Sequence, residues 1–147
     1  MHGSAESIRV LFRSRGLRCT RQREAVYAAL AASRSHPTAD ELLSGVGGDD
    51  PELSLATVYN TLDALCECGL ARRVPSESGG PCRFDADTSH HAHVVMPDGA
   101  VVDVPEDLSR AILSGVPADP LSELCRRLGV KVDRVSVRIH ARPSPSP

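Results

Sequence analysis

Three histidines fall within four positions of the sequence, at His90, His91 and His93, and Asp103 follows ten residues after the last of them. Side chains alternate between the two faces of a β-strand, so His91 and His93 would point to the same side. Asp103 lies on the next strand-like segment and could reach that side too. Imidazole nitrogens combined with carboxylate oxygens suit Fe(II), Mn(II) or Zn(II). The alternative is that the histidines lie on a surface hairpin without binding a metal, because a His-x-His pair alone is weak evidence for a metal site.

Two residues outside this cluster could add ligands to such a site. Asp85 ends the strand-like segment RFD at the junction between the two halves of the chain, and His36 precedes a predicted helix in the first half. The cluster also resembles the start of hydrolase metal motifs. The further histidine and aspartate of those motifs are missing, because the stretch 94–96 reads VVM. The sequence therefore does not favour an enzyme.

The elements that must position these residues begin with helices. Residues 5–15 repeat apolar side chains at helical spacing, and Thr20 can cap a second helix. Thr38 and Glu41 have the spacing of a capping box, in which a hydroxyl and a carboxylate satisfy each other's free backbone donors. A third helix is therefore expected to begin at Thr38.

The fourth predicted helix, SLATVYNTLDALCECG, begins at Ser54 and is closed by Gly69. Its apolar residues share one face, and the opposite face is uncharged at its start and rich in hydrogen-bonding groups. An amide and a hydroxyl near a helix N-terminus suit base edges and phosphates in a major groove. The residues of this outer face are Ala56, Thr57, Asn60 and Asp63, with Tyr59 at its flank.

A basic hairpin is predicted after the fourth helix. Strand-like pieces at 70–74 and 82–85 flank a turn rich in Pro, Ser and Gly, with Arg72 and Arg73 at its base. Helices followed by a basic hairpin are typical of a winged helix-turn-helix domain that binds DNA. Six arginines in the first 23 residues add a local basic stripe, although the net charge is −2. An ordinary helical domain with one exposed hairpin is the alternative.

The second half is predicted to pair a hairpin with two helices and a closing strand. The segments HVVM and AVVDV flank the turn 97–99, and a short helix follows around Leu108. Asp119 and Pro120 are expected to start another helix that Gly129 ends. The stretch 130–140 alternates like a strand, with a phase slip that indicates a bulge or an edge. Because this half has few apolar residues with which to form a core of its own, we expect a second copy of the chain to cover its apolar face.

Composition limits the cellular setting. The chain lacks an apolar run long enough to cross a bilayer and lacks the pattern of a signal peptide, and its five cysteines are an odd number. We therefore expect a cytoplasmic protein with no membrane partner and with reduced thiols. The segment ARPSPSP supplies nothing to bury, so residues 142–147 are expected to form a disordered tail.

Taken in order, several motifs resemble the ferric uptake regulator family over about residues 7–140. They are RGLRCTRQR at 15–23, HPTADEL at 36–42, LATVYNTL at 55–62, GL at 69–70, RFD at 83–85 and HHAH at 90–93. The resemblance implies an α+β protein that acts as a homodimeric repressor of double-stranded operator DNA when metal binds. It implies a winged helix-turn-helix DNA-binding domain over residues 1–84 and a small α/β dimerisation and metal-sensing domain over 85–141.

Carried over residue by residue, the resemblance implies a sensing site and a DNA-binding surface. The implied metal ligands are His36, Asp85, His91, His93 and Asp103. Thr57 and Tyr59 match the recognition helix, and Arg18 matches a basic residue that approaches the minor groove. The full set of expected DNA contacts is Arg18, Arg21, Ser54, Thr57, Tyr59 and Asn60.

Within the family, the sequence is most similar to the peroxide-sensing branch, because that branch typically has an aspartate at the position of Asp85 and an asparagine at the position of Asn60. That likeness implies Fe(II) at the site and oxidation of His36 or His91 by peroxide, whereas Mn(II) would give a repressor indifferent to peroxide. A sensor of iron, manganese or zinc availability is the alternative within the family, and Zn(II) could fill the site in vitro. A metal-dependent hydrolase, or a winged-helix module that uses its second half only for association, are alternatives outside it.

One departure from the family pattern concerns structural zinc. Most relatives carry two C-x-x-C pairs, but here Met96-Pro97-Asp98 occupies the first position and the tail lacks the second. Cys66 and Cys68 lie in the fourth predicted helix and cannot form a tetrahedral four-thiolate site there. We therefore predict no structural zinc. A further metal site of some family members is degraded as well, because Ala92 stands where a carboxylate is usual and Arg134 stands near where a histidine is expected. His90 is therefore left without ligand partners and is expected to be a spectator.

Overall fold

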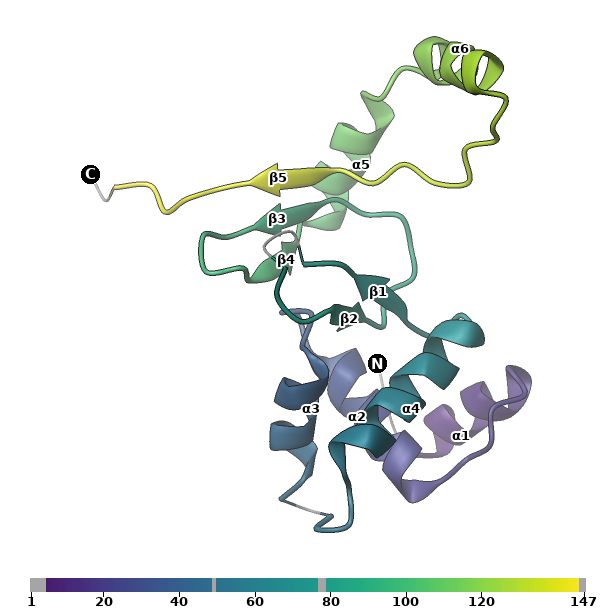
Figure 1. The fold of residues 1–147 in the computed structure, drawn as a ribbon, viewed down its shortest axis with the longest axis vertical. Helices are drawn as coiled ribbons and strands as arrows, with labels where there is room; N and C mark the ends of the chain where they lie inside the picture. The colour runs from purple at the N-terminus through teal and green to yellow at the C-terminus, as the bar shows by residue number, and fades with distance from the viewer. Residues whose placement is uncertain (1–4, 49, 77–78, 146–147) are drawn as a thin grey trace. The chain divides into compact units, whose positions relative to one another are not determined.

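The computed structural model describes residues 5–48, 50–76 and 79–145 and divides the chain into two compact units, Met1–Thr88 and Ser89–Pro147, called unit 1 and unit 2 below. Helices and small sheets together confirm the predicted α+β class (Figure 1). The division lies four residues beyond the predicted one. Asp85 stays in unit 1 because it is the last residue of a strand that pairs with Arg72 in the same unit.

Unit 1 contains four helices followed by a two-stranded antiparallel hairpin, as the sequence predicts for a winged helix. The elements are α1 (Ala5–Ser14), α2 (Arg21–Ala32), α3 (Ala39–Val46), α4 (Leu55–Glu67), β1 (Arg72–Val74) and β2 (Arg83–Asp85). The strands are shorter than predicted, and positions 77 and 78 of the predicted turn lie outside the described residues.

Side-chain caps define the starts of α2, α3 and α4, and the cap of α4 is Ser54. The Thr20 hydroxyl accepts from the Arg23 backbone N–H at 3.2 Å at the start of α2. At α3 both bonds of the predicted capping box form: Glu41 N–H donates to the Thr38 hydroxyl, and Thr38 N–H donates to the Glu41 carboxylate at 2.9 Å. Such caps satisfy backbone donors that a helix start leaves unpaired. Because each cap and its donor are only three residues apart, the sequence alone predicts where these helices begin.

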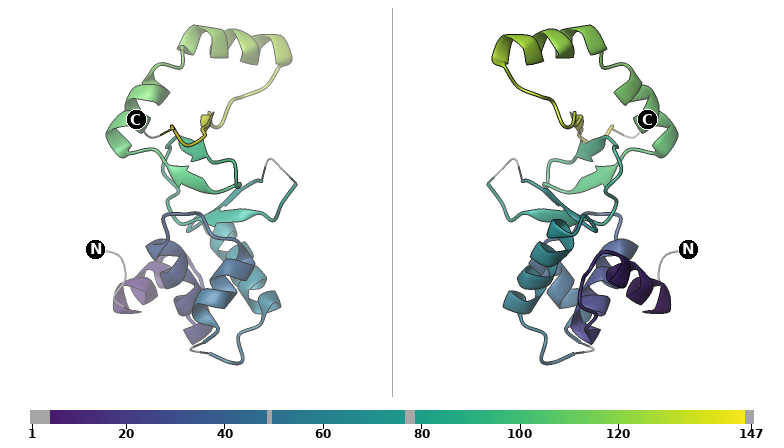
Figure 2. Two further views of the ribbon diagram at one scale, coloured as in Figure 1. Left: turned by 90° about the vertical axis from the view of Figure 1, so that its left-hand side faces the viewer. Right: turned by 90° about the vertical axis from the view of Figure 1, so that its right-hand side faces the viewer.

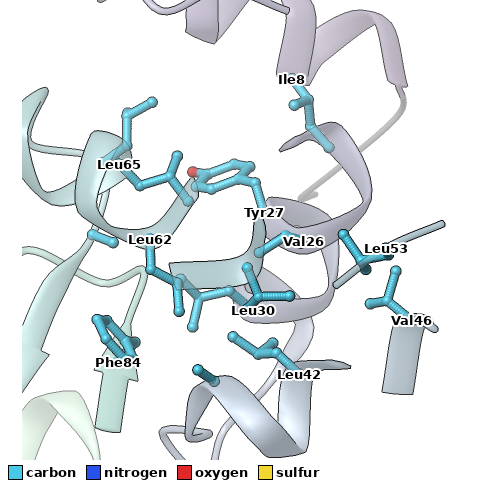
Figure 3. Close-up of a cluster of buried hydrophobic side chains, with 14 of the residues drawn as sticks. Ile8, Val26, Tyr27, Leu30, Leu42, Val46, Leu53, Leu62, Leu65 and Phe84 are labelled. Atoms are coloured by element: carbon cyan, nitrogen blue, oxygen red, sulfur yellow. The ribbon is translucent and has the colours of Figure 1, made fainter. Parts of the chain in front are cut away.

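The core of unit 1 joins the helices to the hairpin (Figure 3). Leu62 and Leu65 of α4 are fully buried, and Phe84 of β2 points into the same cluster. Phe12 and Tyr27 meet edge to face with ring centroids 5.5 Å apart. Because Phe84 is anchored in this core, the β1–β2 hairpin is held against α4 instead of projecting freely from it.

Unit 2 is a three-stranded sheet with two helices. Its elements are β3 (His93–Val95), β4 (Val101–Asp103), α5 (Glu106–Ser114), α6 (Ala118–Leu128) and β5 (Arg138–His140). The central strand β3 pairs antiparallel with β4 and parallel with β5. Within this unit, α6 and the segment after it arch away from the sheet (Figure 2), and α6 has no buried residue.

Two expectations for unit 2 need correction. The last helix starts earlier than predicted: Pro117 is its N-cap, and Asp119 stands in its first turn, where a carboxylate complements the helix dipole. The predicted strand over 130–140 is confirmed only at 138–140, because only β5 finds a partner in β3. Val137 adds one backbone bond, because its carbonyl oxygen accepts the His93 N–H at 3.0 Å. Residues 130–136 alternate in sequence but pair with no strand of the described chain.

The predicted tail is described in part. Residues 142–145 have no regular secondary structure, and 146 and 147 lie outside the described residues, so disorder there stays a prediction. No helix in the described part of the chain is long and apolar enough to span a membrane.

Candidate metal centre

Unit 2 gathers two histidines and a carboxylate. His93 of β3 and Asp103 of β4 are direct cross-strand partners, and His91 stands just before β3. The Nε2 atom of His91 lies 2.7 Å from Oδ1 of Asp103, and Nε2 of His93 lies 3.5 Å from the same oxygen. The two imidazole rings have their centroids 4.6 Å apart. The predicted convergence of these three side chains is therefore present.

The surroundings of His91 fix which of its nitrogens faces Asp103. Its Nδ1 lies 3.1 Å from the Ser89 carbonyl oxygen, which can only accept, so the proton of the neutral ring belongs on Nδ1. The Ala92 N–H donates to the Ser109 hydroxyl at 2.7 Å and holds the adjacent backbone. Nε2 then presents a lone pair to a carboxylate oxygen 2.7 Å away. At that distance the nitrogen and the oxygen are placed to share a proton or to ligate one metal ion.

Unit 1 contains a second, smaller group. The Nε2 atom of His36 lies 3.3 Å from Oδ2 of Asp85. The His36 backbone is held by Arg83, which donates from Nη1 to the His36 carbonyl oxygen at 3.0 Å, and by the Phe84 N–H, which donates to Pro37. His36 also has a φ of 49°, a left-handed conformation that costs a non-glycine residue about 1–3 kcal/mol. The surrounding hydrogen bonds therefore hold the imidazole in a defined place.

Arg72 is a member of this group that the site prediction omitted. Its guanidinium donates to Oδ2 of Asp85 from Nη2 at 2.7 Å and from Nε at 3.1 Å. The sequence contained a signal for this pair, since strands over 70–74 and 82–85 can place positions 72 and 85 opposite each other. The register of β1 and β2 confirms that alignment.

The expected DNA contacts lie at the surface of unit 1. Arg18, Arg21, Ser54, Tyr59 and Asn60 are exposed, and Thr57 is partly buried. Ser54 has a structural task as the N-cap of α4, where its hydroxyl accepts from the Thr57 N–H at 3.2 Å. The Ser54 and Thr57 hydroxyls also lie 2.9 Å apart. Tyr59 and Asn60 are consequently the more available side chains on the outer face of α4.

The five cysteines, all within the described residues, form no disulfide. Burial raises the pKa of the Cys66 thiol, although nearby Arg73 acts in the opposite direction, and burial likewise raises the pKa of the Cys82 thiol. A raised pKa leaves less thiolate at neutral pH, and the thiolate is the reactive form. The fold therefore lowers the fraction of thiolate at Cys66 and Cys82.

We expect Cys66 and Cys82 to alkylate several-fold more slowly with iodoacetamide at neutral pH in the folded protein than in the urea-unfolded protein. The raised pKa and the partial burial of each thiol both slow alkylation. Timed quenching followed by peptide mass spectrometry measures each site separately. Labelling of either thiol as fast in the folded as in the unfolded chain would contradict the assignment.

The comparisons with known proteins agree with this fold. A model described as the ferric uptake regulator family matches residues 14–137. The peroxide-responsive repressor PerR of Staphylococcus saprophyticus is 39% identical over 103 residues, which are 69% of this chain and 68% of that protein. A zinc-bound manganese uptake regulator superposes with a TM-score of 0.67 at 23% identity, covering 97% of this chain and 100% of that one.

PerR from Streptococcus pyogenes superposes with a TM-score of 0.53 at 25% identity, covering 97% of this chain and 92% of that one. The match to the family model includes both units and the winged helix that the motifs predict. It also removes the hydrolase alternative. The chain therefore belongs to the ferric uptake regulator family, whose members are metal-responsive transcriptional regulators and not enzymes.

Proposed function

We propose that this protein is a homodimeric, metal-dependent repressor that binds double-stranded operator DNA and responds to hydrogen peroxide. One observation carries the proposal: each compact unit gathers histidine nitrogen around a carboxylate. His91, His93 and Asp103 form that group in unit 2, and His36 and Asp85 form it in unit 1. Nitrogen and oxygen donors of this kind suit Fe(II) or Mn(II).

We propose that a single metal ion takes ligands from both units. Because the two groups belong to separate compact units, shared ligation would restrict the units to one relative arrangement. Metal would then act as an effector by favouring the arrangement that fits DNA, since a ligand with equal affinity for every arrangement would shift none. The positive φ of His36 and the Arg83 bond to its carbonyl hold the unit 1 imidazole ready for this role.

DNA recognition is assigned to unit 1. Asn60 stands on the outer face of α4 with Tyr59 at its flank, and Thr57 precedes Asn60 by three residues, about one turn. Arg18 and Arg21, both exposed, flank the N-terminus of α2 and could neutralise phosphates. The remaining expected contact, Ser54, is assigned mainly to capping α4.

Dimerisation is assigned to unit 2. Leu124 and Leu128 on α6 are 44% and 64% exposed, and Ile139 of β5 is 37% exposed. Apolar side chains concentrated on one small unit are typical of an interface. Unit 2 has a single cysteine, Cys125, so we propose that apolar packing stabilises the dimer without a structural zinc site.

Bound Fe(II) would supply the one-electron chemistry that activates peroxide, which Mn(II) does not run readily. The chain's part is to place oxidisable imidazoles next to that ion, and His36 and His91 are the proposed targets. An imidazole that gains an oxygen atom is a poorer ligand. Loss of one ligand from either unit would release the units from their shared arrangement and the protein from DNA.

The test is to load the protein anaerobically with Fe(II) or Mn(II), measure binding to its own upstream DNA, and then add peroxide. We expect the Fe(II) form to lose DNA binding and to gain one oxygen atom on the peptides with His36 or His91, measured by mass spectrometry. The Mn(II) form should keep both its mass and its DNA binding. Metal-dependent binding without oxygen gain in the Fe(II) form would identify a sensor of metal availability instead.

A further inference from the structure

Arg72 and Asp85 form a buried ion pair inside unit 1. They are direct cross-strand partners of β1 and β2. The guanidinium donates two hydrogen bonds, of 2.7 and 3.1 Å, to the single oxygen Oδ2. The side chains are only 11% and 8% exposed, so water screens the pair weakly.

The neighbouring arginine provides a natural contrast. Arg73 also pairs with a carboxylate, from Nη2 to Oδ1 of Asp63 at 2.6 Å. The side chains of Arg73 and Asp63 are 55% and 48% exposed, so water and salt screen that pair. Two adjacent arginines therefore each pair with an aspartate, and only the partner of Arg72 is a proposed metal ligand.

The position of Arg72 conflicts with metal binding at Asp85. Oδ2, which receives both arginine bonds, is also the oxygen that lies 3.3 Å from Nε2 of His36. The other oxygen, Oδ1, accepts the Asp87 N–H at 2.8 Å. A divalent cation on Oδ2 would stand beside the positively charged guanidinium of Arg72. Like charges in a weakly screened site repel strongly.

We propose that Arg72 is a built-in competitor of the regulatory metal, which neutralises Asp85 in the metal-free protein and lowers the affinity of the site for divalent cations. This inference rests on the proposed function, because it takes Asp85 as a metal ligand. Arg72 raises the metal concentration at which the regulator responds. It does so through charge, so the two-bond geometry of the guanidinium is secondary.

The experiment compares Mn(II) binding to the full-length native protein and to Arg72→Gln, Arg72→Lys and Arg73→Gln, using the electron paramagnetic resonance signal of free Mn(II). Glutamine keeps one N–H donor for Asp85 and removes the charge, so Arg72→Gln is expected to bind Mn(II) about tenfold more tightly. Lysine keeps the charge, and Arg72→Lys should stay within about threefold of the native affinity. Arg73→Gln, the matched control, should stay within about twofold.

Thermal unfolding supplies a second readout. Metal-free Arg72→Gln should melt below the native protein, because a buried carboxylate has lost its cation, while the rise in Tm on adding Mn(II) should be larger than in the native protein. Equal or weaker Mn(II) affinity in Arg72→Gln would overturn the proposal. If Arg72→Gln does not fold without metal, Arg72→Lys decides: an affinity loss of about tenfold would show that the guanidinium positions Asp85.

Failure of this inference is distinguishable from failure of the proposed function. Metal-dependent DNA binding by the native protein, measured by gel shift, tests the proposed function alone. If that binding is present and the Mn(II) affinities are unchanged by Arg72→Gln, only the role of Arg72 is wrong. If native DNA binding ignores metal, the proposed function is wrong, and the affinities still report whether Arg72 opposes metal at Asp85.

Discussion

His91→Ala is expected to abolish metal-dependent binding to operator DNA while leaving the protein folded and dimeric. The substitution removes the imidazole that lies 2.7 Å from Asp103. Changes to groups that merely support a metal ligand already weaken binding by about 10–100-fold, so loss of the ligand itself should weaken it by at least about 100-fold. The fold should persist, because His91 lies outside β3 and the large apolar cluster belongs to unit 1. Gel-shift titration with Mn(II), together with circular dichroism and light scattering, measures all three properties.

His90→Ala is the matched control for this prediction. His90 is adjacent in sequence and the same residue type, but it is exposed and makes none of the close approaches to Asp103 that His91 and His93 make. Its substitution should leave the Mn(II) dependence of DNA binding unchanged. A normal metal response in His91→Ala, or an equal loss in His90→Ala, would contradict the proposed ligand set.

Leu124→Asp is expected to convert the dimer into monomers and to remove high-affinity operator binding. Leu124 is 44% exposed on α6, a helix with no buried residue, and it shares an apolar stripe with Leu121 and Leu128. A carboxylate buried without a partner in an apolar interface costs several kcal/mol, so the dimer dissociation constant should rise about 100-fold or more. Analytical ultracentrifugation over a concentration series measures that constant directly.

Ser122→Asp separates a loss of the interface from a general effect of added charge. Ser122 lies on the same helix and is exposed, and it stands off the leucine stripe. The Ser122→Asp substitution adds the same negative charge as Leu124→Asp, and we expect the dimer to remain intact. If both variants dissociate, charge on α6 is sufficient by itself. If Leu124→Asp remains dimeric, the interface lies elsewhere in unit 2.

Several parts of the site depend only on nearby sequence. Thr38 and Glu41 define the start of α3 because the two bonds of a capping box span three residues. His93 and Asp103 face each other because a short turn between strands sets the register, and in that turn Gly99 has the positive φ of 82° that glycine permits. Chemistry that spans one cap or one hairpin can be derived from residue types and spacing.

The alternation over 130–140 shows where such derivation stops. An alternating segment becomes a strand only when its backbone donors and acceptors find a partner, and β3 provides partners only for the end of this segment, from the Val137 carbonyl oxygen to His140. Period-two alternation contains no information about partners. The sequence consequently overestimated the length of the last strand.

From the sequence alone came the winged-helix order, the helix caps and the histidine pair facing Asp103, since local hydrogen bonding and side-chain periodicity determine all of them. Only the tertiary structure decided what holds His36 next to Asp85. Arg83 of the hairpin donates to the His36 carbonyl oxygen across forty-seven residues, and the Phe84 N–H donates to Pro37. Those contacts depend on how the hairpin packs against the helices through Phe84, and packing between distant segments is not encoded in local spacing.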